Sequence, residues 1–409
     1  MSGRTVVTGI GVAAPNGLGT ADYWAATVAG RSGIGPVSRF DAGSYPAALA
    51  GEVPGFVAED HLPGRLLPQT DRMTRIALAV ADWALADAGI RPADLPAYDM
   101  GVVTASASGG FEFGQKELKA LWSKGSQHVS AYQSFAWFYA VNTGQISIRN
   151  GMKGPSGVVV SDQAGGLDAL AQARRHIRKG TPVMLSGGVD ASLCPWGWVA
   201  QMAGGRLSTT RDPDRAYLPF DARAHGYVPG EGGALLVLED EAGAHRRGAR
   251  VLGEIAGYGA TFDPAPGSGR PPTLRTAIMT ALADAGLTPG DIDVVFADGA
   301  GLPADDRVEA EALTDVFGPG GVPVTVPKTM TGRLYSGAAS LDVATALLAV
   351  RDGVVPPTVN VEPGSTPELD LVLEARPADL RSVLVLARGH GGFNAALVVR
   401  APATTEGER

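Results

Sequence analysis

The stretch VVVSDQAGGLDAL (158–170) has the pattern of an apolar strand, a glycine-containing turn and the start of a helix. Several enzyme folds mount a nucleophile at such a turn, because the N–H groups and dipole of a helix N-terminus stabilise a thiolate. The residue at this turn is Gln163, and an amide neither attacks an acyl group nor transfers a proton near neutral pH. No G-x-S-x-G elbow occurs in the chain, so a serine hydrolase is not indicated.

The other residues that could carry nucleophilic or metal chemistry are few. Cys194, the single cysteine, follows the apolar segment VMLSGGVD and is interpreted as a small core residue away from any helix N-terminus. One cysteine cannot form an internal disulfide, and none of the six histidines lies four residues from another, as on a metal-binding helix. A metal site is therefore not expected.

The elements that must position the turn are repeated along the chain. Three pairs of segments match in the same order: 84–95 with 281–292, 165–180 with 339–353, and 230–239 with 389–399. Each half alternates apolar strands with helices, which predicts mixed sheets covered by helices, with VVVS (158–161) and PVMLSGG (182–188) buried on both faces.

The spacing of these matches predicts two related α/β halves. The N-terminal half is placed at 1–248 and the C-terminal half at 249–409. Because the distance between matching segments is larger in the first half, that half carries insertions at about 107–150 and 190–228.

Composition excludes several classes of partner. The 409 residues are 45% hydrophobic with a formal net charge of −8 and no long basic run, which argues against nucleic acid and anionic membranes as partners. No apolar run approaches the roughly 20 residues that span a bilayer, and the first residues lack the apolar core of a signal peptide. A cytoplasmic location is expected.

The elbow, GEGGALLVLE (230–239), VPKTMTGRLYSGAAS (326–340) and GHGGFNAA (389–396) together resemble the β-ketoacyl synthase family over nearly the full chain. Within that family the pattern is similar to the chain length factors, the ketosynthase-like partner subunits of bacterial type II aromatic polyketide synthases. The resemblance implies a thiolase-like α/β fold, a duplicated α-β-α-β-α architecture of five layers with two mixed sheets.

The same resemblance implies that the condensing residues are altered. Gln163 stands where the family has its cysteine, and Asp298 and Arg333 stand where it has two histidines that stabilise an enolate. Lys328 is kept, and the loop at 388–391 departs from the Phe-Gly-rich loop of active ketosynthases. Loss of a nucleophile alone costs a covalent enzyme on the order of 10⁶-fold in rate, so the chain is not expected to condense acyl groups itself. Asp298 and Arg333 could pair across the vacated pocket.

The resemblance implies that the chain acts by shaping a binding tunnel for the product. Chain length factors form heterodimers with a cysteine-bearing ketosynthase α subunit, here as one heterodimer or a dimer of heterodimers, and a tunnel at the interface takes the growing polyketide chain. The malonyl units arrive on acyl carrier protein, which brings the phosphopantetheine, so no bound cofactor is expected. The aromatic run at 134–148 is a candidate contact with the partner.

One segment fits the wall of such a tunnel. Phe111, Gly114 and Leu118 recur at helical spacing and fall where the resemblance places the gating residues. The small side chain at 114 and the modest one at 118 predict a product longer than the octaketide class. Trp196 and Trp198 are further candidates for the wall, or else ordinary packing residues.

Three alternatives remain open or are disfavoured. Gln163 could support decarboxylation of malonyl-acyl carrier protein to prime synthesis, or it could plug an inactive pocket in a purely structural pseudoenzyme. Likewise the stripe at 111–118 could be ordinary core. A homodimeric fatty-acid ketosynthase is disfavoured because the cysteine and both histidines are missing.

Overall fold

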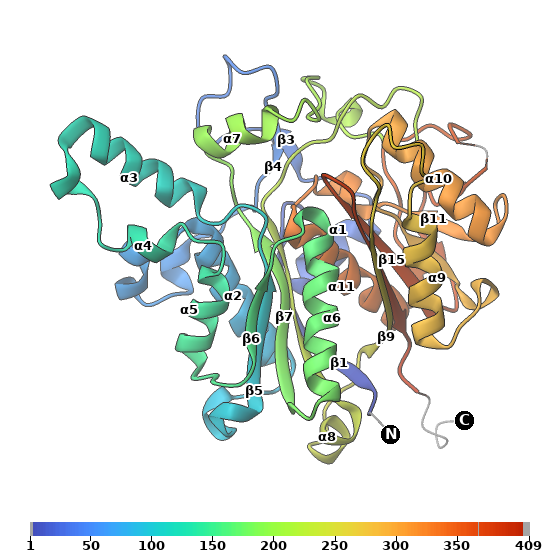
Figure 1. The fold of residues 1–409 in the computed structure, drawn as a ribbon, viewed down its shortest axis with the longest axis horizontal. Coiled ribbons are helices and arrows are strands. Elements are labelled where there is room, and N and C mark those ends of the chain that lie inside the picture. Colours follow the sequence, from blue (N-terminus) through green and yellow to red (C-terminus); the bar gives the residue numbers. More distant parts are fainter. Residues whose placement is uncertain (1–2, 367, 404–409) are drawn as a thin grey trace.

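The computed structural model describes residues 3–366 and 368–403, and most of its strands join in one twelve-stranded sheet (Figure 1). The strand order is β13-β11-β10-β15-β16-β9-β1-β8-β7-β5-β6, and β2 pairs with β1. The strands are β1 (Thr5–Ala14), β2 (Gly17–Leu18), β5 (Met100–Ala105), β6 (Ser156–Val159), β7 (Val183–Asp190), β8 (Gly232–Asp240), β9 (Gly253–Phe262), β10 (Val294–Phe296), β11 (Pro323–Thr325), β13 (Asp370–Leu371), β15 (Ser382–Gly389) and β16 (Phe393–Arg400). Two small antiparallel pairs complete the set: β3 (Ile34–Pro36) with β4 (Leu49–Gly51), and β12 (Val354–Val355) with β14 (Arg376–Pro377).

The sheet has two halves with the same pairing pattern. In the first half, β5 lies parallel to both β6 and β7, and β8 runs antiparallel to both β7 and β1. In the second half, β10 lies parallel to β11 and β15, and β16 runs antiparallel to β15 and β9. The two predicted mixed sheets are present as these halves, but they are continuous, because β1 pairs with β9 at Val6 and Val7. The predicted boundary at 248–249 lies between α8 (Glu241–Arg246) and β9.

Helices form three layers around the two halves of the sheet, as the predicted α-β-α-β-α order requires (Figure 1). α2 packs on β1 and β8, α9 packs on β9 and β16, and α6 and α11 pack against each other between the halves. The helices are α1 (Thr20–Val28), α2 (Arg72–Asp87), α3 (Phe111–Lys124), α4 (Gln133–Ala136), α5 (Val141–Asn150), α6 (Gly165–Arg178), α7 (Pro195–Met202), α8, α9 (Leu274–Ala285), α10 (Pro303–Phe317) and α11 (Ser336–Asp352). None of them, within the described ranges, is both long and apolar enough to cross a membrane.

The strongest sequence repeat is confirmed as a repeated structure. α2 ends two residues before Gly89, and α9 ends directly before Gly286; both glycines are in the left-handed region, with φ of 64° and 67°. This conformation lets the chain reverse after the last turn of the helix, and glycine adopts it without a steric clash because it has no Cβ atom. A 3₁₀ turn then leads to a buried parallel strand, Pro92–Asp94 before β5 and Pro289–Asp291 before β10.

The prediction that both apolar strands are buried on two faces is correct for one of them. Every residue of β7 is buried. The segment at 158–161 is different, because β6 is the last strand of the sheet and its residues are exposed or half-buried, with Val160 49% exposed just after it. An apolar strand is expected to be covered by other elements, but no other part of the described chain packs over the outer edge of β6.

Candidate functional site

The elbow that carries Gln163 has the predicted strand, turn and helix. β6 ends at Val159, a short 3₁₀ turn (Asp162–Ala164) follows, and α6 begins at Gly165. Asp162 has a positive φ of 51°, which is uncommon for a residue with a side chain. Its carboxylate accepts a hydrogen bond from the backbone N–H of His390 at 2.6 Å, which ties the β15–β16 turn to the elbow.

The amide of Gln163 is buried and engaged on both sides. Its side chain is 3% exposed. In the orientation that satisfies both of its groups, the amide oxygen accepts from Arg333 Nε at 3.2 Å and the amide nitrogen donates to the carbonyl oxygen of Tyr335 at 3.1 Å. Both polar groups of the amide therefore already have partners within the chain.

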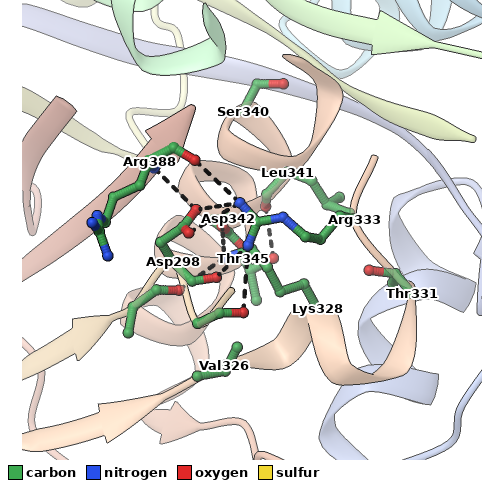
Figure 2. A network of polar contacts seen from close by, with 12 residues as sticks. Asp298, Val326, Lys328, Thr331, Arg333, Ser340, Leu341, Asp342, Thr345 and Arg388 are labelled. Atoms are coloured by element: carbon green, nitrogen blue, oxygen red, sulfur yellow. Dashed lines mark hydrogen bonds and ion pairs between the residues drawn. The ribbon is translucent and has the colours of Figure 1, made fainter. Parts of the chain in front are cut away.

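Asp298 and Arg333 form a buried ion pair, as the sequence suggested they could. Both carboxylate oxygens of Asp298 accept from Arg333 Nη2 at 3.0 Å, and both side chains are at most 3% exposed (Figure 2). Arg333 Nη1 also donates to the carbonyl oxygen of Asp298 at 3.2 Å. Burial alone would raise the pKa of Asp298, but the charges of Arg333 and Lys328 outweigh it and lower the pKa below its ordinary value.

A second buried pair lies beside the first (Figure 2). Lys328 Nζ lies 2.6 Å from a carboxylate oxygen of Asp342 and donates to the carbonyl oxygen of Ala297 at 2.8 Å. Glu309 accepts from the backbone N–H groups of Asp298 and Gly299 at 2.7 and 2.9 Å. Burial raises the pKa of Asp342 to about 6, against the lowering effect of Lys328. Each of these charged side chains thus lies against an opposite charge or backbone N–H groups inside the protein.

Sequence reasoning missed Asp342 and Glu309, although the sequence contains a signal for the first. Asp342 lies in SLDVATALLAV, an otherwise apolar segment that becomes the buried helix α11. A lone acid in such a helix needs a buried cation, and the retained Lys328 provides it. Glu309 gave no such signal, because α10 carries several acids and only packing decides which of them is buried.

Three of the four predicted tunnel residues come together at the N-terminal end of α3. The rings of Phe111 and Trp196 lie 4.6 Å apart between centroids, and a Cβ at Gly114 would lie 2.9 Å from Cζ3 of Trp196. Phe111 also lines a cavity of about 220 Å³ that reaches Tyr335 and His390 beside the elbow. Leu118, one turn further along α3, does not line this cavity and is 38% exposed.

The structure decides one open question and corrects one expectation about neighbouring residues. Trp198 is a packing residue and not a wall residue: it is completely buried and its Nε1 donates to the carbonyl oxygen of Ala47 at 3.1 Å. Cys194 is a core residue as expected, but it does lie at a helix N-terminus, because it caps α7 directly before Pro195. The Pro at the first helical position indicated this helix start in the sequence.

The thiol of Cys194 is expected to be unreactive despite this position. Burial raises its pKa to about 11, so almost no thiolate forms near neutral pH. We predict that iodoacetamide at pH 7.5 does not label the folded protein within an hour and labels it fully in denaturant, as measured by intact-protein mass spectrometry. Fast labelling of the folded chain would show that the thiol is accessible and activated.

The sequence matches two family models and several known proteins. The models of the β-ketoacyl synthase N-terminal and C-terminal domains match residues 3–244 and 252–362. The tetracenomycin polyketide synthase ketoacyl synthase beta subunit of Streptomyces glaucescens is 62% identical over 400 residues, covering 97% of this chain and 98% of that protein. The 3-oxoacyl-[acyl-carrier-protein] synthase 2 of Coxiella burnetii is 33% identical over 405 residues, covering 97% of this chain and 98% of that protein.

The fold is also shared with solved structures. The ishigamide ketosynthase/chain length factor superposes with a TM-score of 0.89 at 30% sequence identity, covering 98% of this chain and 100% of that chain. A β-ketoacyl synthase from Burkholderia phymatum superposes with a TM-score of 0.90 at 28% identity and the same coverage. The thiolase-like fold predicted from the sequence is therefore confirmed, and with both family domains matched in order, this chain belongs to the β-ketoacyl synthase family.

Proposed function

We propose that this chain is a chain length factor, the non-condensing subunit of a type II polyketide synthase that pairs with a cysteine-bearing ketosynthase and limits the length of the poly-β-ketone. The observation that carries the proposal is the site itself. The resemblance assigns Gln163, Asp298 and Arg333 to the three positions that condensation requires, and in the structure they bond to one another or to the backbone. The 62% identical relative is named a ketoacyl synthase beta subunit, which supports the same role.

The surface of the chain supports a ketosynthase partner. The edge of β6 offers unpaired backbone groups to another strand. Trp137, Phe138 and Tyr139, between α4 and α5, are each more than 40% exposed, as is Ile148 on α5. Exposed aromatic residues beside an open sheet edge are typical of a protein interface. The ishigamide neighbour is described as a ketosynthase/chain length factor pair.

An acyl carrier protein is the proposed source of the extender units. Another structural neighbour is a type II polyketide synthase acyl carrier protein in complex with its ketosynthase bound to a hexaketide, with a TM-score of 0.87 at 26% identity. We propose that phosphopantetheine reaches the assembly on that carrier. The wall formed by Phe111, Gly114 and Trp196 would then meet the growing chain in the tunnel.

We predict that the assembly makes polyketide only when both subunits are present and that acyl groups attach to the partner alone. The chain would be incubated with malonyl-acyl carrier protein, with and without a type II ketosynthase, and each subunit weighed by intact-protein mass spectrometry. The cysteine of the ketosynthase serves as the positive control for acylation. A covalent acyl adduct on this chain would contradict its non-condensing role.

The same mixture separates the proposal from a malonyl decarboxylase. Because the Gln163 amide is already bonded to Arg333 and Tyr335, we expect Gln163→Ala to change carbon dioxide release less than twofold in an intact heterodimer. A loss of tenfold or more, with dimerisation and melting temperature preserved, would assign a decarboxylation role to Gln163.

A further inference from the structure

Helix α3 projects from the body of the protein and has no cap of its own. It extends away from the sheet together with α4 (Figure 1). Its N-cap residue is Gly110, which has no side chain to accept from the free N–H groups of the first turn. A helix that carries the proposed tunnel wall on its first turns therefore depends on another part of the chain to fix its start.

Asp71 supplies the missing cap from a different helix. It is the N-cap of α2 and is 2% exposed. One carboxylate oxygen accepts from the backbone N–H of Met73 at 2.8 Å, in the first turn of α2. The other accepts from the backbone N–H of Phe113 at 2.8 Å, in the first turn of α3. A single negative charge thus bonds to the positive ends of two helix dipoles.

The close approach of the two helix starts depends on the glycine at 110. A Cβ there would lie 2.9 Å from Cβ of Asp71 and 2.3 Å from the carbonyl oxygen of Ala136. Any larger residue must push α3 away from Asp71. The glycine at 110 therefore allows the Asp71 carboxylate to come close enough to cap α3.

Three other side chains of α3 bond to segments outside the helix. Glu112 pairs with Arg39 at 2.7 Å, and Gln115 accepts from the backbone N–H of Trp196 at 2.6 Å. Glu117 accepts from the backbone N–H of Ser130 at 2.6 Å. Asp71 differs from these because it begins α2, whose buried face packs on the sheet.

We propose that Asp71 is a positioning residue for control of chain length: its carboxylate holds the start of α3, and with it Phe111 and Gly114, at a fixed place relative to the core. This inference rests on the proposed function, since it concerns the tunnel wall. Asp71 does not touch the growing chain. It acts through the helix that does.

The arrangement makes length control sensitive to pH. Burial raises the pKa of the Asp71 carboxyl to about 7, although the N–H groups of Phe113 and Met73 lower it. The charged or titratable groups facing it are Glu112 on α3, Arg75 on α2 and the Cys194 thiol before α7. A proton on either oxygen removes one acceptor, so the hold on α3 weakens as the pH falls through 7.

The effect of this group on global stability has the opposite sign. Its pKa in the folded state lies above the ordinary value of 3.8, so the folded state binds the proton more tightly than the unfolded state. Protonation between pH 7 and 4 therefore raises the free energy of unfolding. A loss of length control on mild acidification cannot then be attributed to unfolding driven by Asp71.

The experiment measures products of the reconstituted synthase by mass spectrometry, as the ratio of off-length to main polyketide. For Asp71→Asn, which can accept from only one of the two N–H groups, we expect this ratio to rise about tenfold at pH 8. The wild-type ratio should rise toward that value at pH 6, while the ratio for Asp71→Asn stays flat. Asp240→Asn is the matched control, because Asp240 caps only α8, by accepting from Gly243 N–H at 3.1 Å.

Each outcome has a defined meaning. If Asp71→Asn does not fold, the wild-type pH profile and Gly110→Ala, which displaces α3 without removing the carboxylate, test the same inference. An unchanged ratio in these tests overturns the role of Asp71 if Gly114→Phe still alters length. If Gly114→Phe also leaves the length unchanged, the proposed function of α3 fails, and the inference fails with it.

Discussion

Gly114→Phe will shorten the polyketide made by the assembled synthase by at least one two-carbon unit. Gly114 is buried on α3, and a Cβ at this position already lies 2.9 Å from the indole ring of Trp196. A phenyl ring must therefore displace Trp196, which is 37% exposed and packs against the ring of Phe111. A bulky group at the wall reduces the length of chain that the tunnel accepts.

The measurement is the mass of the products from the reconstituted heterodimer, compared at equal conversion. Gly243→Phe in α8 is the matched control, because it makes the same substitution where a Cβ meets no atom closer than 3.6 Å. The control should give the wild-type length. Wild-type products from an intact Gly114→Phe heterodimer would mean that this face of α3 is ordinary core.

Replacing Arg333 with Met will destabilise the fold by about 3–5 kcal/mol, because it leaves the buried carboxylate of Asp298 without its cation. The pair is completely enclosed, and Arg333 also bonds to the backbone and to Gln163. Chemical denaturation followed by circular dichroism gives the change in the free energy of unfolding. The dependence of that free energy on denaturant concentration is measured separately for each variant.

Two variants define the cause of this loss. The double variant Asp298→Asn/Arg333→Met removes both charges and should regain most of the stability. Arg381→Met breaks the pair with Asp379, in which both side chains are about 80% exposed, and should cost less than about 1 kcal/mol. Equal losses for Arg333→Met and the double variant would show that packing, and not the unpaired charge, stabilises this site.

Much of the fold could be predicted because the signals are local. The matching segments 84–95 and 281–292 each contain a helix end, a glycine and a proline turn, and these have the same conformation wherever they occur. The strand, turn and helix around Gln163 follow from the same kind of pattern. The amide at the turn is likewise a matter of residue type at one position, which needs no coordinates.

What the sequence left open or predicted wrongly depends on distant segments. Trp196 and Trp198 are two residues apart in the same short helix, yet one lies against Phe111 and the other is completely buried. The apolar segment after Ser156 was predicted to be covered, but it forms an open edge. Hydrophobic composition predicts that a segment is buried. Whether other elements of the same chain bury it depends on how those elements pack.

The sequence by itself determined the duplicated α/β architecture, the elbow and the glutamine at its turn, because each is written in short-range pattern or in residue identity. Only the tertiary structure decided how Arg333 is shared between Asp298 and Gln163, and that Asp71 caps a helix that begins forty residues later. Such contacts join residues that the chain brings together only on folding, and burial gives them their energy by excluding water.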